Sequence, residues 1–135
     1  MQLHLKIIGC ILIILAAIHI AFPKRFNWKA EFVSLSLINR QVMYVHTFFI
    51  ALVVFGMGVL CLTCANDLVN TRLGSKIAFG LFTFWFIRWL CQLFVYSSKL
   101  WRGKRFETWV HILFIFLWTY FCIVFFVVYW FSHGA

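Results

Sequence analysis

The residue with the most unusual chemical setting in this sequence is Arg88, because it stands near the centre of a long apolar stretch, residues 77–98. A helix of about 20 residues is long enough to cross the hydrocarbon of a bilayer, and this stretch has that length. A guanidinium at mid-depth costs about 2.5–3.5 kcal/mol on insertion scales. Gln92 follows one helical turn later and so lies on the same face. The pair predicts a polar stripe on a membrane-spanning helix, and hence a ligand-binding site.

Arg88 has no obvious counter-ion in its own chain. The sequence has three acidic residues, and all lie outside the apolar stretches: Glu31, Asp67 and Glu107. Two alternatives follow. Either neutral groups satisfy the guanidinium, or an anionic ligand or another subunit does. The neutral groups would be hydrogen-bond acceptors, on Tyr120, Thr119 or the backbone near Gly56, or the ring of Trp118 by stacking. Side chains of a helix lean toward its N-terminus. We therefore expect the Arg88 side chain to have a local partner and not to extend toward the C-terminal end of its helix.

Three histidines form a second group that could do chemistry. In an antiparallel arrangement of helices, His19, His46 and His111 would lie near the same membrane face, and Gln92 and Tyr96 would approach that face from the third apolar stretch. Imidazole is the commonest metal ligand, so the triad could bind zinc, copper or non-haem iron, or a pair could hold one haem. No two histidines have the short spacing of a helical metal motif, and the alternative is that they contact lipid headgroups.

Cys61 and Cys64 form a C-x-x-C motif at the end of the second apolar stretch. A membrane thiol oxidoreductase would need an exposed thiolate of low pKa, and usually a second cysteine pair that passes electrons on. Both cysteines lie in apolar sequence, where a cysteine usually behaves as a small hydrophobic residue. The first alternative function is electron transfer by a single haem or metal bound to the histidines. Thiol redox chemistry at Cys61 and Cys64 is the second alternative.

The composition places these residues in a membrane. Hydrophobic residues make up 65% of the chain and charged residues only 11%, against about 25% charged in soluble domains. The formal net charge is +9, but Lys and Arg lie almost wholly outside the apolar stretches. This distribution is typical of topology signals and of contact with anionic lipid, so it argues against nucleic-acid binding. Small proton-coupled transporters normally need an intramembrane acid, which is absent from these stretches.

Four apolar stretches predict an all-α polytopic membrane protein, an antiparallel bundle of four transmembrane helices in a single membrane domain, 1–135. We expect spans at approximately 3–22, 43–65, 77–98 and 108–131, with Pro23 ending the first. Residues 27–41 show near-helical spacing of apolar side chains, which predicts an interfacial amphipathic helix between spans one and two. Residues 66–76 are expected to form a polar loop.

The distribution of positive charge predicts the orientation. Loops 23–42 and 99–107 together hold eight Lys and Arg residues, and the opposite side holds three. The positive-inside rule therefore places these two loops in the cytoplasm and both termini outside.

Several segments together resemble a group of small four-span bacterial membrane proteins to which no activity is assigned. The resemblance depends on His19, Pro23 and Trp28, on LINRQ at 37–41, and on FWFIRWLCQ at 84–92. It implies a bacterial inner membrane and directs attention to His19, Arg88 and Gln92.

The sequence thus predicts a small integral membrane protein, more a binding protein than an enzyme, whose polar cluster lies in the cytoplasmic leaflet. The cluster would bind a lipid, a quinone-like molecule, or a metal or haem, or would dock a larger membrane complex. Its expected ligand-binding residues are Arg88, Gln92, His19, Tyr96 and Tyr120, and its expected metal ligands are His19, His46 and His111.

Overall fold

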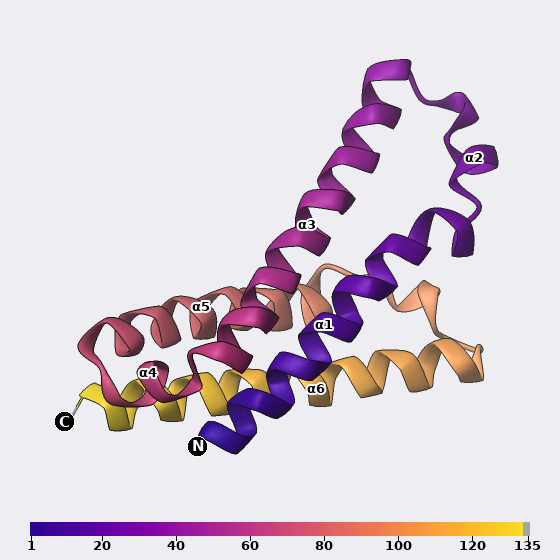
Figure 1. Cartoon of the computed structure of the whole chain (residues 1–135). Helices are drawn as coiled ribbons and strands as arrows, with labels where there is room; N and C mark the ends of the chain where they lie inside the picture. The colour runs from indigo at the N-terminus through magenta and orange to yellow at the C-terminus, as the bar shows by residue number, and fades with distance from the viewer. Residues whose placement is uncertain (134–135) are drawn as a thin grey trace. The chain divides into compact units, whose positions relative to one another are not determined.

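The computed structural model describes residues 1–133, and every regular element in that range is helical (Figure 1). In chain order the elements are α1 (Gln2–Arg25), α2 (Trp28–Glu31), the 3-10 turn η1 (Phe32–Ser34), α3 (Leu37–Thr63), α4 (Ala65–Asn70), α5 (Arg72–Phe94), the 3-10 turn η2 (Ser98–Leu100) and α6 (Arg105–His133).

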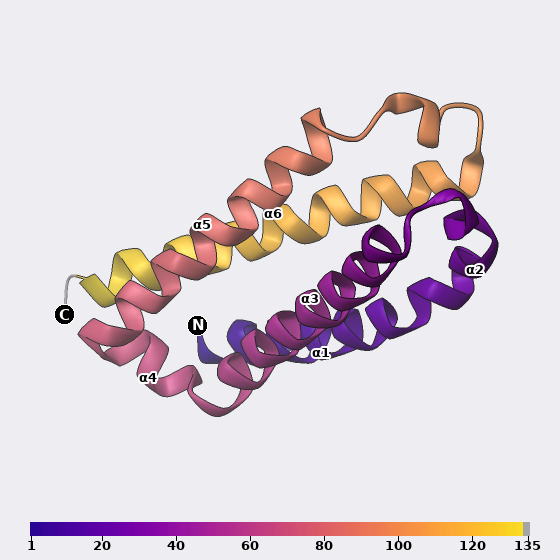
Figure 2. The same ribbon diagram turned by 90° about the horizontal axis from the view of Figure 1, so that it is seen from above.

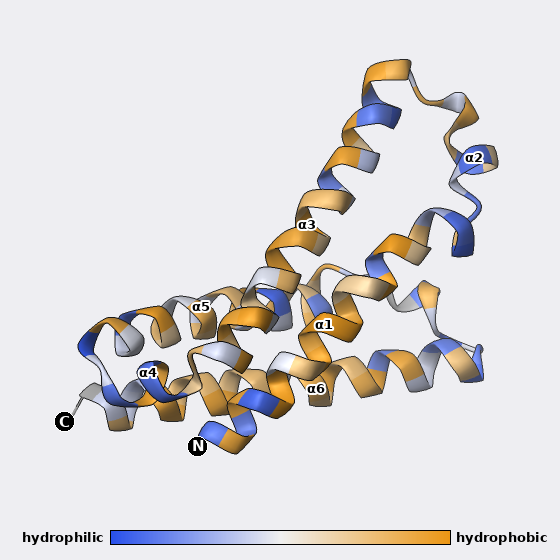
Figure 3. Ribbon diagram, viewed as in Figure 1, coloured by the Kyte–Doolittle hydropathy of each residue, from blue (hydrophilic) through white to orange (hydrophobic). Residues whose placement is uncertain are grey.

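The helices α1, α3, α5 and α6 are each long and apolar enough to cross a membrane. Figure 3 shows the same property as hydrophobic colour along most of each long helix, with hydrophilic residues gathered toward the ends and in the connections. The predicted all-α fold with four long apolar helices and a short helix between the first two is therefore confirmed. The chain is that of a small four-span integral membrane protein.

The chain divides into two compact units. The α1–α3 unit contains residues 3–65, and the α5–α6 unit contains residues 1–2 together with the chain from residue 66 onward. In each unit two long helices run antiparallel, as Figure 2 shows from above. That both units form one membrane domain and one bundle stays a prediction.

Within the α1–α3 unit the two long helices approach closely at two glycines. A Cβ atom on Gly9 would lie 2.9 Å from the carbonyl oxygen of Gly58, and one on Gly58 would lie 3.0 Å from the carbonyl oxygen of Gly9. Small residues permit such close backbone approach, which stabilises helix pairs in lipid where no hydrophobic effect drives association.

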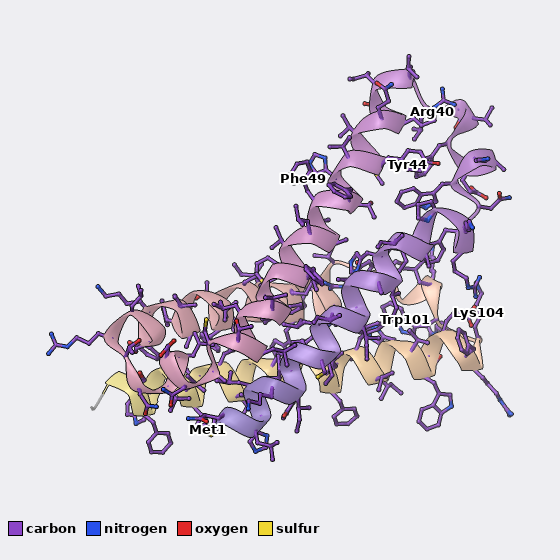
Figure 4. All side chains as sticks on the ribbon, viewed as in Figure 1. Met1, Arg40, Tyr44, Phe49, Trp101 and Lys104 are labelled. Atoms are coloured by element: carbon purple, nitrogen blue, oxygen red, sulfur yellow. The ribbon has the colours of Figure 1, made fainter. Side chains whose placement is uncertain are left out.

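The connection from α1 to α3 is less helical than predicted. Pro23 does not end α1, because a proline near the end of a helix removes only one hydrogen bond, and the helix continues to Arg25. Asn27 then adopts a left-handed backbone conformation, with φ 48°, which reverses the chain. In place of the predicted helix over 27–41 there are α2, η1 and the start of α3. The ring of Trp28 in α2 packs against that of Tyr44, which is labelled on α3 in Figure 4.

The second span also begins earlier than predicted. The side chain of Ser36 accepts a hydrogen bond from the backbone N–H of Asn39 at 3.4 Å and so caps α3, which begins at Leu37. The helix therefore includes polar residues 39–41, which hydropathy alone assigned to the preceding segment.

In the α5–α6 unit, most of the predicted polar loop 66–76 is helical. The hydroxyl of Thr71 accepts a hydrogen bond from the N–H of Gly74 at 2.9 Å and caps α5. Two hydroxyls then link this region to the end of α6: Ser75 donates to the carbonyl of Tyr129 at 3.3 Å, and Ser132 donates to the carbonyl of Thr71 at 3.2 Å. These bonds fix the register of α5 against α6 at the end remote from Arg88.

At the other end, α5 stops at Phe94, earlier than the predicted limit at residue 98. Tyr96 consequently lies beyond the helix. The connection to α6 contains η2 and a turn at Gly103, whose φ of +83° favours glycine. Trp101 and Lys104 of this connection are labelled in Figure 4.

Candidate functional site: a polar cluster on α5 and α6

A chain of hydrogen bonds connects α5 to α6 at the predicted polar stripe. The guanidinium of Arg88 donates from Nη1 to the amide oxygen of Gln92 at 3.3 Å, and Gln92 Nε2 lies 2.7 Å from Nδ1 of His111 on α6. Gln92 is only 6% exposed, so its amide depends on these two partners. The structure thus brings together Arg88, Gln92 and His111, all predicted as site residues.

The direction of these bonds fixes the state of the imidazole. Arg88 can only donate, so the oxygen of the Gln92 amide faces it and the NH₂ group faces His111. Nδ1 of His111 must then accept, which makes the ring the neutral tautomer with its proton on Nε2. One amide therefore holds a cation on one side and a neutral base on the other.

Two aromatic faces complete the surroundings of Arg88. Its guanidinium carbon lies 5.3 Å from the ring centroid of Trp118 on α6 and 5.5 Å from that of Tyr96. Contact with the ring of Trp118 is thus present, as one of the alternatives for a neutral partner. The expected lean toward the N-terminus is wrong, because hydrogen bonding to Gln92 and contact with Tyr96 turn the side chain toward the C-terminal end of α5. This is the direction in which a long cationic side chain reaches the membrane interface.

The contacts of Arg88 in the described part of the chain are thus with neutral side chains. The three acidic residues lie elsewhere: Glu31 in α2, Asp67 in α4 and Glu107 in the first turn of α6. A cation in such a setting has hydrogen-bonding capacity and charge left for an anion.

Trp101 is a component of the site that the sequence did not reveal. Its indole stacks on His111 with ring centroids 3.7 Å apart and an angle of 13° between the planes. Thr108 Oγ1 donates to the carbonyl of Trp101 at 2.9 Å and holds the connection against the start of α6. One feature of the sequence could have indicated this contact. Trp101 stands in a short connection between two antiparallel helices, and such a connection lies close to the first turns of the helix that follows.

His19 and His46 belong to the α1–α3 unit, whereas His111 belongs to the α5–α6 unit. Nδ1 of His19 lies 2.7 Å from the carbonyl of Leu15, and Nδ1 of His46 lies 3.2 Å from that of Val42. Among residues 1–133 no group of three or more His, Cys, Asp or Glu side chains has an arrangement suited to a metal ion. The metal-binding role of the three histidines stays a prediction.

Two other polar residues near Arg88 have different environments. Thr119 accepts a hydrogen bond from the indole N–H of Trp89 at 3.0 Å and donates to the carbonyl of Ile115 at 2.8 Å, so its hydroxyl serves the packing of α5 on α6. Tyr120 is partly buried, with its ring 6.3 Å from that of Phe121. A role for Tyr120 in ligand binding stays a prediction.

Cys61 of the C-x-x-C pair lacks the exposure that thiol chemistry needs. Cys61 is fully buried and Cys64 partly buried, and both are free thiols. The Oγ1 atom of Thr63 lies 3.5 Å from the sulfur of Cys64. An attacking thiolate must reach its substrate, so this geometry favours a packing role for Cys61.

Comparison with known proteins adds no relative: no protein-family model, no curated protein and no solved structure matches this chain.

Proposed function

We propose that this four-span membrane protein binds an acidic ligand dissolved in the membrane, and that Arg88 supplies the charge that recognises it. The observation that carries the proposal is the pairing of Arg88, on a membrane-spanning helix, with one neutral amide and two aromatic rings in place of a carboxylate.

The energetic reason is that a cation in apolar surroundings is costly unless an opposite charge accompanies it. A hydrogen bond from a guanidinium to an oxyanion is about twice as strong as one to a neutral acceptor, and Arg can bind carboxylate or phosphate through two parallel bonds. Gln92 accepts from one of the five N–H groups, and in this proposal the ligand accepts from others.

The position of Arg88 suits a ligand that enters from the lipid. Arg88 lies about six residues before the end of α5, or about 9 Å by helical rise, and its side chain turns toward that end. The connection that follows and the first residue of α6 carry four basic residues, all exposed: Lys99, Arg102, Lys104 and Arg105. Such a cluster attracts acidic lipids of the cytoplasmic leaflet at about 1 kcal/mol per basic residue. We therefore include in the proposal a cytoplasmic position for this connection and a bacterial inner membrane for the protein.

Native mass spectrometry of the detergent-solubilised protein tests the proposal directly. Phosphatidylglycerol, phosphatidylcholine and a neutral quinone are titrated separately onto the wild-type chain and onto Arg88→Gln. Arg105→Gln, which removes the same charge from the exposed start of α6, is the matched control.

We expect a saturable complex with phosphatidylglycerol that weakens about tenfold or more in Arg88→Gln and little in Arg105→Gln. Equal weakening in both variants would show diffuse attraction to the basic surface and would refute a specific site. Binding of the quinone in preference to the acidic lipid would also overturn the proposal that the ligand is acidic.

A second candidate function is one-electron transfer through a haem or metal, which one observation favours. Because Nδ1 of both His19 and His46 is held by a carbonyl of its own helix, Nε2 of each ring is directed outward as the nitrogen that would bind a metal. A visible absorption spectrum with metal analysis tests it. A Soret band or stoichiometric metal that His46→Ala abolishes would support this function, and a colourless, metal-free protein would exclude it.

A further inference from the structure

Two stacked indoles of the α5–α6 unit, one of them in contact with Arg88, have buried N–H groups without an acceptor. Nε1 of Trp85 and Nε1 of Trp118 have no hydrogen-bond partner in the described part of the chain, although the side chains are only 2% and 4% exposed. Buried donors of this kind are rare in folded proteins and call for an explanation. The contact of Trp118 with Arg88 suggests what the explanation is.

The two indoles and the guanidinium form one continuous group. The rings of Trp85 and Trp118 stack with centroids 4.8 Å apart and 18° between their planes, and Arg88 lies over Trp118 at 5.3 Å. The other aromatic neighbours of this pair are phenylalanines, which carry no oxygen or nitrogen: Phe84, Phe114 and Phe121. Within the group, Arg88 donates to the amide oxygen of Gln92, and the two indole N–H groups have no acceptor among the described residues.

Trp89 shows that the absence of acceptors is local. It lies one helical turn after Trp85 on the same helix, and its N–H donates to Thr119 at 3.0 Å. A hydroxyl on α6 therefore can satisfy an indole of α5, yet none is placed at Trp85 or Trp118. An indole N–H donates and cannot accept, so whatever binds here must bring lone pairs.

We infer that Trp85 and Trp118 are further ligand-binding residues of the Arg88 site, and that the ligand is an oxyanion with several acceptor oxygens, a phosphate or carboxylate. This inference rests on the proposed function and names the chemistry of the ligand. The guanidinium neutralises the charge, and the indoles donate to remaining oxygens. A ligand with a single carbonyl oxygen, such as a quinone, would satisfy fewer of these donors.

The test follows the indole N–H signals by proton–nitrogen NMR of the full chain labelled with ¹⁵N-tryptophan, in an uncharged maltoside detergent. Seven tryptophans give few signals, which single Trp→Phe variants assign. Short-chain phosphatidic acid, decanoate and inorganic phosphate are added separately. Trp89 serves as the internal control, because its N–H already has an acceptor.

We expect the signals of Trp85 and Trp118 to shift to higher proton frequency and to saturate, while that of Trp89 stays in place. A response to phosphatidic acid or decanoate but not to inorganic phosphate identifies an amphiphile as the source of the oxyanion; a response to all three identifies the oxyanion group alone. Affinity in Trp118→Phe should fall about tenfold, because this variant keeps an aromatic ring and loses the N–H donor.

Two results would overturn the inference, and they are distinguishable. If the ligand binds in an Arg88-dependent manner and neither indole signal moves, the indoles are not ligands and the proposed function survives. If no oxyanion binds and no signal moves, both the inference and the proposed function fail.

Discussion

Replacing Gln92 by Glu changes one NH₂ group to oxygen and tests how Arg88 is used. In the wild-type chain Arg88 Nη1 lies 3.3 Å from the amide oxygen of Gln92. A glutamate at this position would place a carboxylate at the same distance, on the same face of α5. It would give Arg88 the counter-ion that its own chain lacks, so an acidic ligand would have to compete with it.

The expected loss of affinity can be worked from that distance. Two unit charges 3.3 Å apart attract by about 5 kcal/mol at an effective dielectric constant of about 20. Desolvation of the new carboxylate subtracts several kcal/mol. A net gain of about 1.5–3 kcal/mol, typical of a hydrogen bond between charged groups, remains for the internal pair. An external oxyanion must overcome this amount, which corresponds to about 10–150-fold weaker binding.

The assay is a titration of phosphatidylglycerol by native mass spectrometry, with Gln41→Glu as the control. Gln41 is exposed near the start of α3, in the α1–α3 unit, so this variant makes the same change in net charge outside the hydrogen-bonded cluster of Arg88. Gln92→Glu should lose affinity while Gln41→Glu retains it. If Gln92→Glu binds the acidic lipid as tightly as the wild type, the reasoning about the missing counter-ion is wrong.

Three further predictions concern the fold and the cluster. Gly58→Ala should lower the free energy of unfolding by up to about 2 kcal/mol, because a Cβ there meets the backbone of α1 at 3.0 Å. A Cβ on Gly56 meets nothing within 4 Å, so Gly56→Ala should be neutral or stabilising by up to about 1 kcal/mol. Unfolding in mixed detergent compares the two variants, and equal effects would contradict the close approach of α1 and α3. In ¹⁵N NMR the neutral His111 should carry its proton on Nε2 in the wild type, and a proton on Nδ1 would refute the assigned direction of the Gln92 bond. N-ethylmaleimide should modify the partly exposed Cys64, just beyond the end of α3, faster than the fully buried Cys61, and comparable rates would restore the thiol function.

The fold class could be predicted from hydropathy because each apolar stretch is long and distinct. The helix ends could not, since they depend on local hydrogen bonds that hydropathy ignores. Ser36 and Thr71 each cap a helix several residues before its apolar part begins. Asn27, in a left-handed conformation, interrupts a segment whose apolar spacing alone suggests one continuous helix.

The cluster was predictable in part. Helical periodicity placed Arg88 and Gln92 on one face, and antiparallel pairing brought His111 to the same end of the hairpin. The path of the Arg88 side chain was not predictable, because the contact with Tyr96 depends on where α5 ends. The stack of Trp101 on His111 depends likewise on the fold of the connection. Side-chain donors without acceptors, such as the indole of Trp118, are visible only once neighbours are placed.

The most direct test of the central claim is to identify what the protein retains when it is purified gently from its native membrane. Organic extraction and mass spectrometry of wild-type, Arg88→Gln and Arg105→Gln proteins would measure the retained amphiphiles per chain. The account predicts about one acidic amphiphile per chain in the wild type and in Arg105→Gln, and its loss in Arg88→Gln. An identical profile in all three proteins would contradict a ligand site at Arg88.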